Sequence, residues 1–123
     1  MDWLRIEGGR EIAARVPAGD LVVASDFSTL PPTDPRLLFR ADREGWPMRA
    51  REITRDRLEK LLPFGARWVA VLTDPEHPEV AAPEFLAPLI AAEVPVAHEG
   101  RMLGTLHLYD LRRGLDGAPS GRP

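Results

Sequence analysis

The chain has 123 residues, of which 44% are hydrophobic and 28% are charged, so it is long enough for one domain with one core. Its formal net charge of −3 argues against the basic surface that nucleic-acid binding requires. It contains no cysteine, which excludes disulfides and thiolate metal sites. No apolar run approaches the roughly 20 residues of a membrane span, and the first residues show no secretory signal pattern.

The segment from Gly65 to Asp74 has the clearest structural pattern in the chain. It is a short apolar run, rich in β-branched and aromatic residues, and it indicates a strand over 67–73 that is buried on both faces. Strands of this kind lie in the middle of a sheet covered by helices, usually beside parallel neighbours.

Helical and strand patterns alternate before and after this strand. Periodicity and capping residues predict helices over about 9–15, 34–43, 55–63 and 83–92, and strands over about 21–25, 45–48, 94–98 and 104–111. The first helix is expected to begin after a break at Gly8-Gly9, and Pro88 is expected to bend or shorten the last one. The two final strands are close enough in sequence for an antiparallel hairpin.

The order of these elements predicts an α/β fold. We expect a small Rossmann-like three-layer sandwich, with parallel central strands and an antiparallel C-terminal hairpin. One domain is expected over residues 1–113, and the composition of residues 114–123 predicts a disordered tail. The first strand is not followed by a glycine-rich phosphate loop, and the chain has no Walker motif, so no cofactor is predicted.

Asp26 and Asp74 are the main candidates for chemistry, because each comes directly after a predicted parallel strand. In open α/β sheets, ligands bind outside the carboxyl ends of such strands. Two carboxylates there can hold a divalent cation or act as acid and base, and His77 is a third candidate ligand-binding residue nearby. The alternative is that each carboxylate caps the turn that follows it.

The other two histidines belong to the predicted hairpin. His98 and His107 can face each other across it, which makes a His/His/Asp metal site conceivable. However, no pair of histidines has a tight ligand spacing such as i, i+4. Solvated or cross-strand packing histidines are therefore the favoured interpretation, and we predict no metal site.

A stretch of seven arginines surrounds Trp46; these are Arg36, Arg40, Arg43, Arg49, Arg51, Arg55 and Arg57. Of these, Arg40 and Arg43 with Trp46 are our candidates for a surface that meets an anionic lipid headgroup or a phosphate-bearing substrate. Carboxylates are interspersed among the arginines. Mixed signs of this kind are also typical of a solvated, ion-paired surface, which is the alternative.

Four segments together resemble a known family. They are residues 16–26, 34–46, 58–72, and 94–100 with Leu108-Tyr-Asp-Leu111. The set is similar to the soluble C-terminal domain of polytopic, lipid-linked-sugar glycosyltransferases, the C-type membrane enzymes related to protein mannosyltransferases and to the aminoarabinose transferase of lipid A. The resemblance covers about residues 9–112 and implies a small α/β domain outside the cytoplasm. It implies no catalytic residue here, because the family's catalytic acids lie in the membrane portion.

Three hypotheses about function follow from the sequence. The first is a non-catalytic accessory or binding domain, whose partner is a membrane glycosyltransferase or a lipid-phosphate headgroup. The second is a small-ligand-binding protein or metal-dependent enzyme that uses Asp26 and Asp74. The third is a homodimerising module that pairs through residues 45–48 or through the terminal hairpin. The resemblance implies an extracytoplasmic location, whereas a stand-alone chain without a signal would be cytoplasmic.

Overall fold

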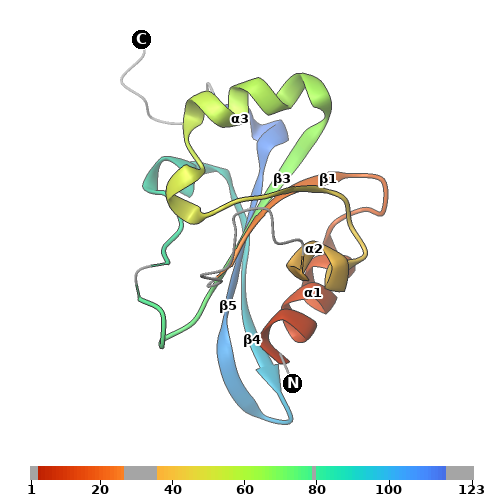
Figure 1. The fold of residues 1–123 in the computed structure, drawn as a ribbon, viewed down its shortest axis with the longest axis vertical. Helices are drawn as coiled ribbons and strands as arrows, with labels where there is room; N and C mark the ends of the chain where they lie inside the picture. The colour runs from red at the N-terminus through yellow and green to blue at the C-terminus, as the bar shows by residue number, and fades with distance from the viewer. Residues whose placement is uncertain (1–2, 27–35, 79, 116–123) are drawn as a thin grey trace.

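A computed structural model describes residues 3–26, 36–78 and 80–115 of the chain, which form a mixed five-stranded sheet in the order β2-β1-β3-β5-β4 (Figure 1). The strands are β1 (Leu21–Ser25), β2 (Gly45–Pro47), β3 (Ala66–Thr73), β4 (Ile90–His98) and β5 (Arg101–Asp110). The α-helices are α1 (Trp3–Arg15), α2 (Arg36–Ala41) and α3 (Arg55–Leu61). The 3₁₀ segments are η1 (Ala50–Glu52), η2 (Leu62–Phe64), η3 (Glu84–Leu89) and η4 (Leu111–Arg113). The predicted α/β class is therefore confirmed.

Strand β3 lies in the middle of the sheet, as its sequence predicts. It pairs with β1 in parallel and with β5 in antiparallel orientation. Its side chains alternate between two cores, with Ala70 and Leu72 on one face and Val69 and Val71 on the other. The prediction that this strand is buried on both faces is confirmed.

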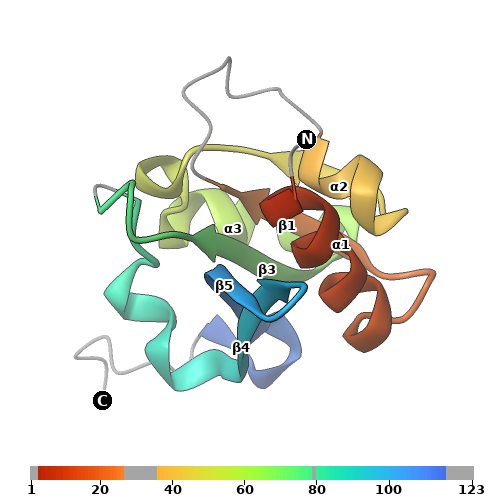
Figure 2. The same ribbon diagram turned by 90° about the horizontal axis from the view of Figure 1, so that it is seen from below.

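Different elements cover the two faces of the sheet. On one face, Ile12 of α1 and Leu37 of α2 belong to the same core as Leu72. On the other face, Leu58 of α3 and Leu86 of η3 pack in the second core. Figures 1 and 2 show α1 and α2 side by side, with α3 apart from both. None of the helices in the described ranges has both the length and the apolar character that crossing a bilayer demands.

Helix α1 begins at Trp3 and continues through Gly8 and Gly9, so the predicted break at these glycines is wrong. Both glycines are buried where α1 crosses α2. A Cβ atom on Gly9 would lie 2.7 Å from the carbonyl carbon and the Cβ of Arg40. The absence of a side chain lets the two helices approach closely, and this packing outweighs the low helix propensity of glycine.

The helix predicted over 83–92 is wrong in its second half. Glu84–Leu89 forms the 3₁₀ segment η3, and β4 begins directly after it, at Ile90. Pro88 lacks a backbone N–H and clashes with a preceding carbonyl in an α-helix, so the segment cannot continue as one. Pairing with β5 from Ile90 to His98 then fixes the extended conformation.

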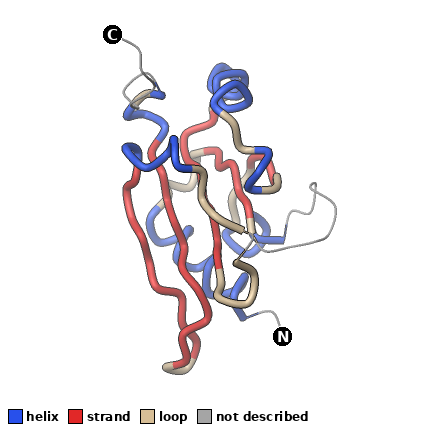
Figure 3. Tube along the Cα trace, turned by 90° about the vertical axis from the view of Figure 1, so that its left-hand side faces the viewer, coloured by secondary structure: helices blue, strands red, loops and turns tan. Residues whose placement is uncertain are grey.

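The predicted antiparallel hairpin is confirmed, with longer strands than the sequence indicates. β4 and β5 run side by side as the long pair of red strands in Figure 3. Within the predicted tail, Leu115 is buried in the second core. The predicted start of the second helix at Asp34-Pro35 and the rest of the tail, residues 116–123, lie outside the described residues.

Candidate functional site

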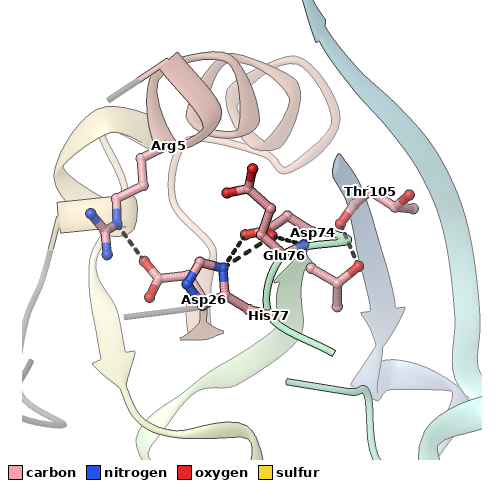
Figure 4. A network of polar contacts seen from close by, with 7 residues as sticks. Arg5, Asp26, Asp74, Glu76, His77 and Thr105 are labelled. Carbon is pink, nitrogen blue, oxygen red and sulfur yellow. Dashed lines mark hydrogen bonds and ion pairs between the residues drawn. The ribbon is translucent and has the colours of Figure 1, made fainter. Parts of the chain in front are cut away.

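Asp26 and Asp74 lie at the same edge of the sheet, as predicted. Each directly follows a strand, and these strands, β1 and β3, are parallel neighbours with Ser25 opposite Val71. Figure 4 shows this edge, with His77 beside Asp74. The structure therefore brings the three predicted ligand-binding residues to one region of the molecule.

Asp26 is paired with Arg5 of α1. The Arg5 Nε donates a hydrogen bond of 2.7 Å to Asp26 Oδ2, and the two side chains are only 6% and 12% exposed (Figure 4). A buried charge is costly unless it is paired, so each of these groups makes the burial of the other tolerable. The pair ties α1 to the end of β1.

Sequence reasoning did not identify Arg5 as part of this site, although a signal was present. The buried residues of α1 are Arg5, Gly8, Gly9 and Ile12, which follow the i, i+3, i+4, i+7 spacing of a buried helical stripe. With the helix assumed to begin only at residue 9, Arg5 fell outside this stripe. Burying the charge of an arginine is costly unless it is paired, so an arginine on the buried face of a helix predicts a carboxylate partner.

Asp74 caps the turn that leaves β3. Its Oδ1 accepts a hydrogen bond of 2.7 Å from the Glu76 backbone N–H. His77 Nδ1 lies 2.9 Å from Oδ2 and 3.0 Å from Oδ1 of the same carboxylate. The Asp74 side chain is 7% exposed and that of His77 is 32% exposed. These contacts are the ones expected from the turn-capping alternative.

Both carboxylates at the sheet edge are therefore engaged within the protein. Asp26 lies against the Arg5 guanidinium, and Asp74 lies against the His77 imidazole. Within the described ranges, no group of three or more histidine, aspartate or glutamate side chains is arranged to hold a metal ion.

His98 and His107 do not face each other. His98 is opposite Arg101 in the hairpin, and His107 is opposite Glu93. The register therefore separates the two imidazoles and does not form the His/His pair that the sequence left conceivable.

His98 contacts α1. Its ring stacks on that of Trp3, with 3.6 Å between the ring centroids and an interplanar angle of 14°. Its Nδ1 lies 3.0 Å from Glu7 Oε2. The contact fastens the first turns of α1 to the end of β4, so His98 has a packing role of the kind favoured from the sequence.

His107 forms a cross-strand contact with β3. The Thr73 hydroxyl donates a hydrogen bond of 3.3 Å to the Thr105 carbonyl oxygen (Figure 4), and it also lies 3.1 Å from His107 Nε2. Because the hydroxyl has one proton to donate, it accepts from the imidazole. Burial lowers the pKa of His107, and nearby Glu93 opposes that shift. The net effect is a pKa of His107 below its usual value.

Arg40, Arg43 and Trp46 are not gathered into one surface. Arg43 donates to the carbonyl oxygens of Val16, at 2.6 Å, and of Ala13, at 3.1 Å, so it binds the end of α1. Arg40 is exposed on α2. Trp46 packs against the core on the opposite face of the sheet from the one that α2 covers.

Trp46 instead lines a groove between the β2 segment and α3. The other lining residues are Met48, Arg57, Lys60 and Leu61, and the groove has a volume of about 400 Å³. Of these residues, only Trp46 was predicted from the sequence as a candidate binding residue. The missed signal is the spacing of Arg57, Lys60 and Leu61 at i, i+3 and i+4, which places them on one face of a helix.

The chain matches no protein-family model and has no significant match among curated proteins or solved structures. The resemblance to the C-terminal domains of C-type glycosyltransferases thus depends on the sequence segments described above. An α/β fold hosts many unrelated functions and assigns no activity by itself. The side chains at the sheet edge and in the groove are the basis for a functional proposal.

Proposed function

We propose that this chain is a non-catalytic accessory domain that binds an anionic partner, in the manner of an extracytoplasmic tail of a lipid-linked-sugar glycosyltransferase. The pairing of the carboxylates at the sheet edge is the observation that carries the proposal. A general base must be able to take a proton from a substrate. Asp26 and Asp74 instead hold α1, β1 and the turn after β3 together through Arg5 and His77.

The chemistry of the partner follows from the groove. Arg57 and Lys60 lie beside the apolar side chains of Trp46, Met48 and Leu61. Guanidinium and ammonium groups bind phosphate oxygens through charge-assisted hydrogen bonds. The net charge of the chain is −3, so recognition of an anion depends on this local arrangement and not on overall attraction. A lipid-phosphate headgroup, or an acidic surface of a membrane glycosyltransferase, has the matching charge.

Binding to lipid vesicles tests this proposal. The purified chain is expected to co-sediment with vesicles that contain phosphatidic acid and not with vesicles of phosphatidylcholine alone. Added salt is expected to weaken the binding, because surface charges are screened over about 10 Å at 0.1 M ionic strength. Asp74→Asn is the control variant, and its binding is expected to equal that of the wild type. If the chain fails to bind either kind of vesicle, lipid binding is not its function.

The sheet edge supports a second candidate function, the binding of a small ligand. The Arg5–Asp26 ion pair and the His77–Asp74 contact lie at the carboxyl ends of β1 and β3 (Figure 4), where α/β sheets bind ligands. A sugar phosphate that binds there is expected to raise the midpoint of thermal unfolding by mass action. No change with sugar phosphates, nucleotides or divalent cations would remove this candidate.

We also propose that the fold is a small Rossmann-like, three-layer sandwich. The parallel order β2-β1-β3 supports this description. The two cores on opposite faces of the sheet support it as well. In this description, the antiparallel strands β4 and β5 continue the same sheet beyond the parallel strands β2, β1 and β3.

A further inference from the structure

Two elements form the groove, and each presents a regular set of side chains to it. Trp46 and Met48 are two residues apart in an extended segment, so they point to the same side. Arg57, Lys60 and Leu61 share one face of α3. The volume of about 400 Å³ lies within the range of small-molecule sites, roughly 300–1,000 Å³.

The floor of the groove is apolar. Trp46, Met48 and Leu61 are half-buried, and they pack against the second core on their inner sides. Their outer sides line the groove. A hydrocarbon chain placed there would cover apolar surface that now contacts water, which is favourable at roughly 25 cal/mol per Å² buried.

Both charged residues that line the groove are cations. Lys60 pairs with Asp56 at 3.1 Å, but the two side chains are 74% and 76% exposed, so this ion pair is weak and can yield to another anion. Arg57 is exposed, and its side chain forms no ion pair with the residues that the structure describes. The charge beside the apolar floor is therefore complementary to an anionic head.

The neighbouring sheet edge disfavours an added peptide strand as the occupant. The Met48 N–H donates to the Ala24 carbonyl oxygen, so it points toward β1. Backbone N–H directions alternate along a strand, and the nitrogen of Pro47 therefore points outward. Proline has no N–H, so a peptide beside β2 would lack a hydrogen-bond donor at this position.

We propose that this groove binds one anionic membrane lipid. The phosphate of the headgroup accepts hydrogen bonds from Arg57 and Lys60, and an acyl chain lies on Trp46, Met48 and Leu61. This inference rests on the proposed function and gives it a location and a ligand class.

Charge reversal at the groove, with a matched control, tests the location. The groove variant is Arg57→Glu with Lys60→Glu, and the control is Arg67→Glu with Arg101→Glu, which are exposed on β3 and β5. Both variants change the net charge by the same amount. We expect the groove variant to bind phosphatidic acid vesicles at least about twenty-five-fold more weakly than the wild type, because each lost basic residue contributes about fivefold and the two added carboxylates repel the anionic membrane. The control variant is expected to stay within about threefold, and circular dichroism checks that both are folded.

The results separate this inference from the proposed function. If both variants lose affinity equally, attraction is spread over the surface and the groove is not the site, while lipid binding stands. If the wild type binds no vesicles, the proposed function fails. In that case, binding of a monomeric short-chain phosphatidic acid, followed by NMR shifts of the Trp46, Arg57 and Lys60 resonances, would still support the groove.

Inorganic phosphate distinguishes a lipid site from a simple phosphate site. We expect the short-chain lipid to shift the resonances of both the cations and Trp46, and phosphate alone to shift neither at the same concentration. Equal shifts with phosphate would overturn the assignment to a lipid. Absence of shifts with the short-chain lipid would overturn the groove as its binding site.

Discussion

At the scale of single residues, Arg43 shows how one side chain fastens two helices. Its guanidinium donates to the carbonyl oxygens of Ala13 and Val16 at the end of α1, and to that of Ala41 at the end of α2. Carbonyl groups at the ends of helices lack partners within the helix. We expect Arg43→Ala to lower the free energy of unfolding by about 1–3 kcal/mol, measured by urea denaturation.

Arg40→Ala is the matched control for this prediction. Arg40 is exposed on α2, and its replacement is expected to change the free energy of unfolding by less than about 0.5 kcal/mol. Equal stability of the Arg43 and Arg40 variants would show that the carbonyl contacts of Arg43 contribute nothing.

A second prediction concerns the acid side of the stability curve. The hydrogen bond with His98 and the nearby charge of Arg10 hold the pKa of Glu7 below its usual value of 4.5. A carboxyl group whose pKa is lowered by folding stabilises the protein fully above its ordinary pKa. That contribution disappears as the pH falls through the lowered pKa. Stability is therefore expected to decrease with acidification in this window.

Glu7→Gln is expected to remove this part of the pH dependence, because an amide that does not titrate replaces the carboxyl group beside His98 Nδ1. The measurement is the free energy of unfolding at a series of pH values from neutral to acidic. Glu59→Gln, an exposed position on α3, is the control and should keep the curve of the wild type. A Glu7→Gln curve parallel to that of the wild type would contradict the linkage.

The sequence allowed Asp26 and Asp74 to be placed together because one rule covers both: the carboxyl ends of parallel strands meet at one edge. It did not allow their partners to be named. Arg5 was missed because two glycines suggested a break in its helix. Arg43 binds carbonyl groups about 30 residues away in the sequence, at the end of another helix. Local sequence patterns do not predict contacts between residues so far apart.

At the scale of elements, the crossing of α1 and α2 depends on Gly9. Alanine is the better helix former by about 1 kcal/mol, so propensity alone predicts that Gly9→Ala stabilises the protein. The added Cβ would lie 2.7 Å from backbone and side-chain carbons of Arg40. We expect overpacking to dominate and to give a net loss of about 1–3 kcal/mol in thermal or urea unfolding.

Gly19→Ala tests the same substitution without the crowding. A Cβ on Gly19 has no heavy atom within 4 Å, so this variant should be neutral or slightly stabilising. A Gly9→Ala variant that is more stable than the wild type would mean that the two helices separate at little cost.

The helices and strands were predictable where the spacing of the apolar residues fitted only one kind of secondary structure. β3 and β1 have short apolar runs that fit only buried strands. The stretch from Phe85 to Ile90 has apolar residues at helical spacing, but Pro88 prevents an α-helix and Ile90 pairs with Tyr109 of β5. That partner is distant in sequence, so local periodicity could not identify it.

At the scale of the whole molecule, β2 and β4 are the edge strands of the sheet that the described residues form. Each contains a proline, Pro47 in one and Pro95 in the other, which offers no backbone N–H to a second chain. We therefore expect the isolated domain to sediment as a monomer and not to form the homodimer through residues 45–48 or the hairpin. Sedimentation velocity over a range of protein concentrations measures this.

Pro95→Thr restores a donor and a good strand residue to the longer edge. This variant is expected to associate more strongly than the wild type as concentration rises. A stable wild-type dimer whose interface includes β4 would show that the proline does not protect this edge.

The position of β5 has a consequence for how the protein is made. Among the strands that the structure describes, β5 comes last in sequence, yet it lies between β3 and β4. While the chain is being synthesised, β3 has no partner on one side until Arg101–Asp110 has left the ribosome. β4 cannot join the sheet before β5 is made either, because β5 is the strand with which it pairs. A nascent chain that stops short of Arg101 leaves the edge of β3 open and both cores unfinished, which makes it a natural client for chaperones and proteases.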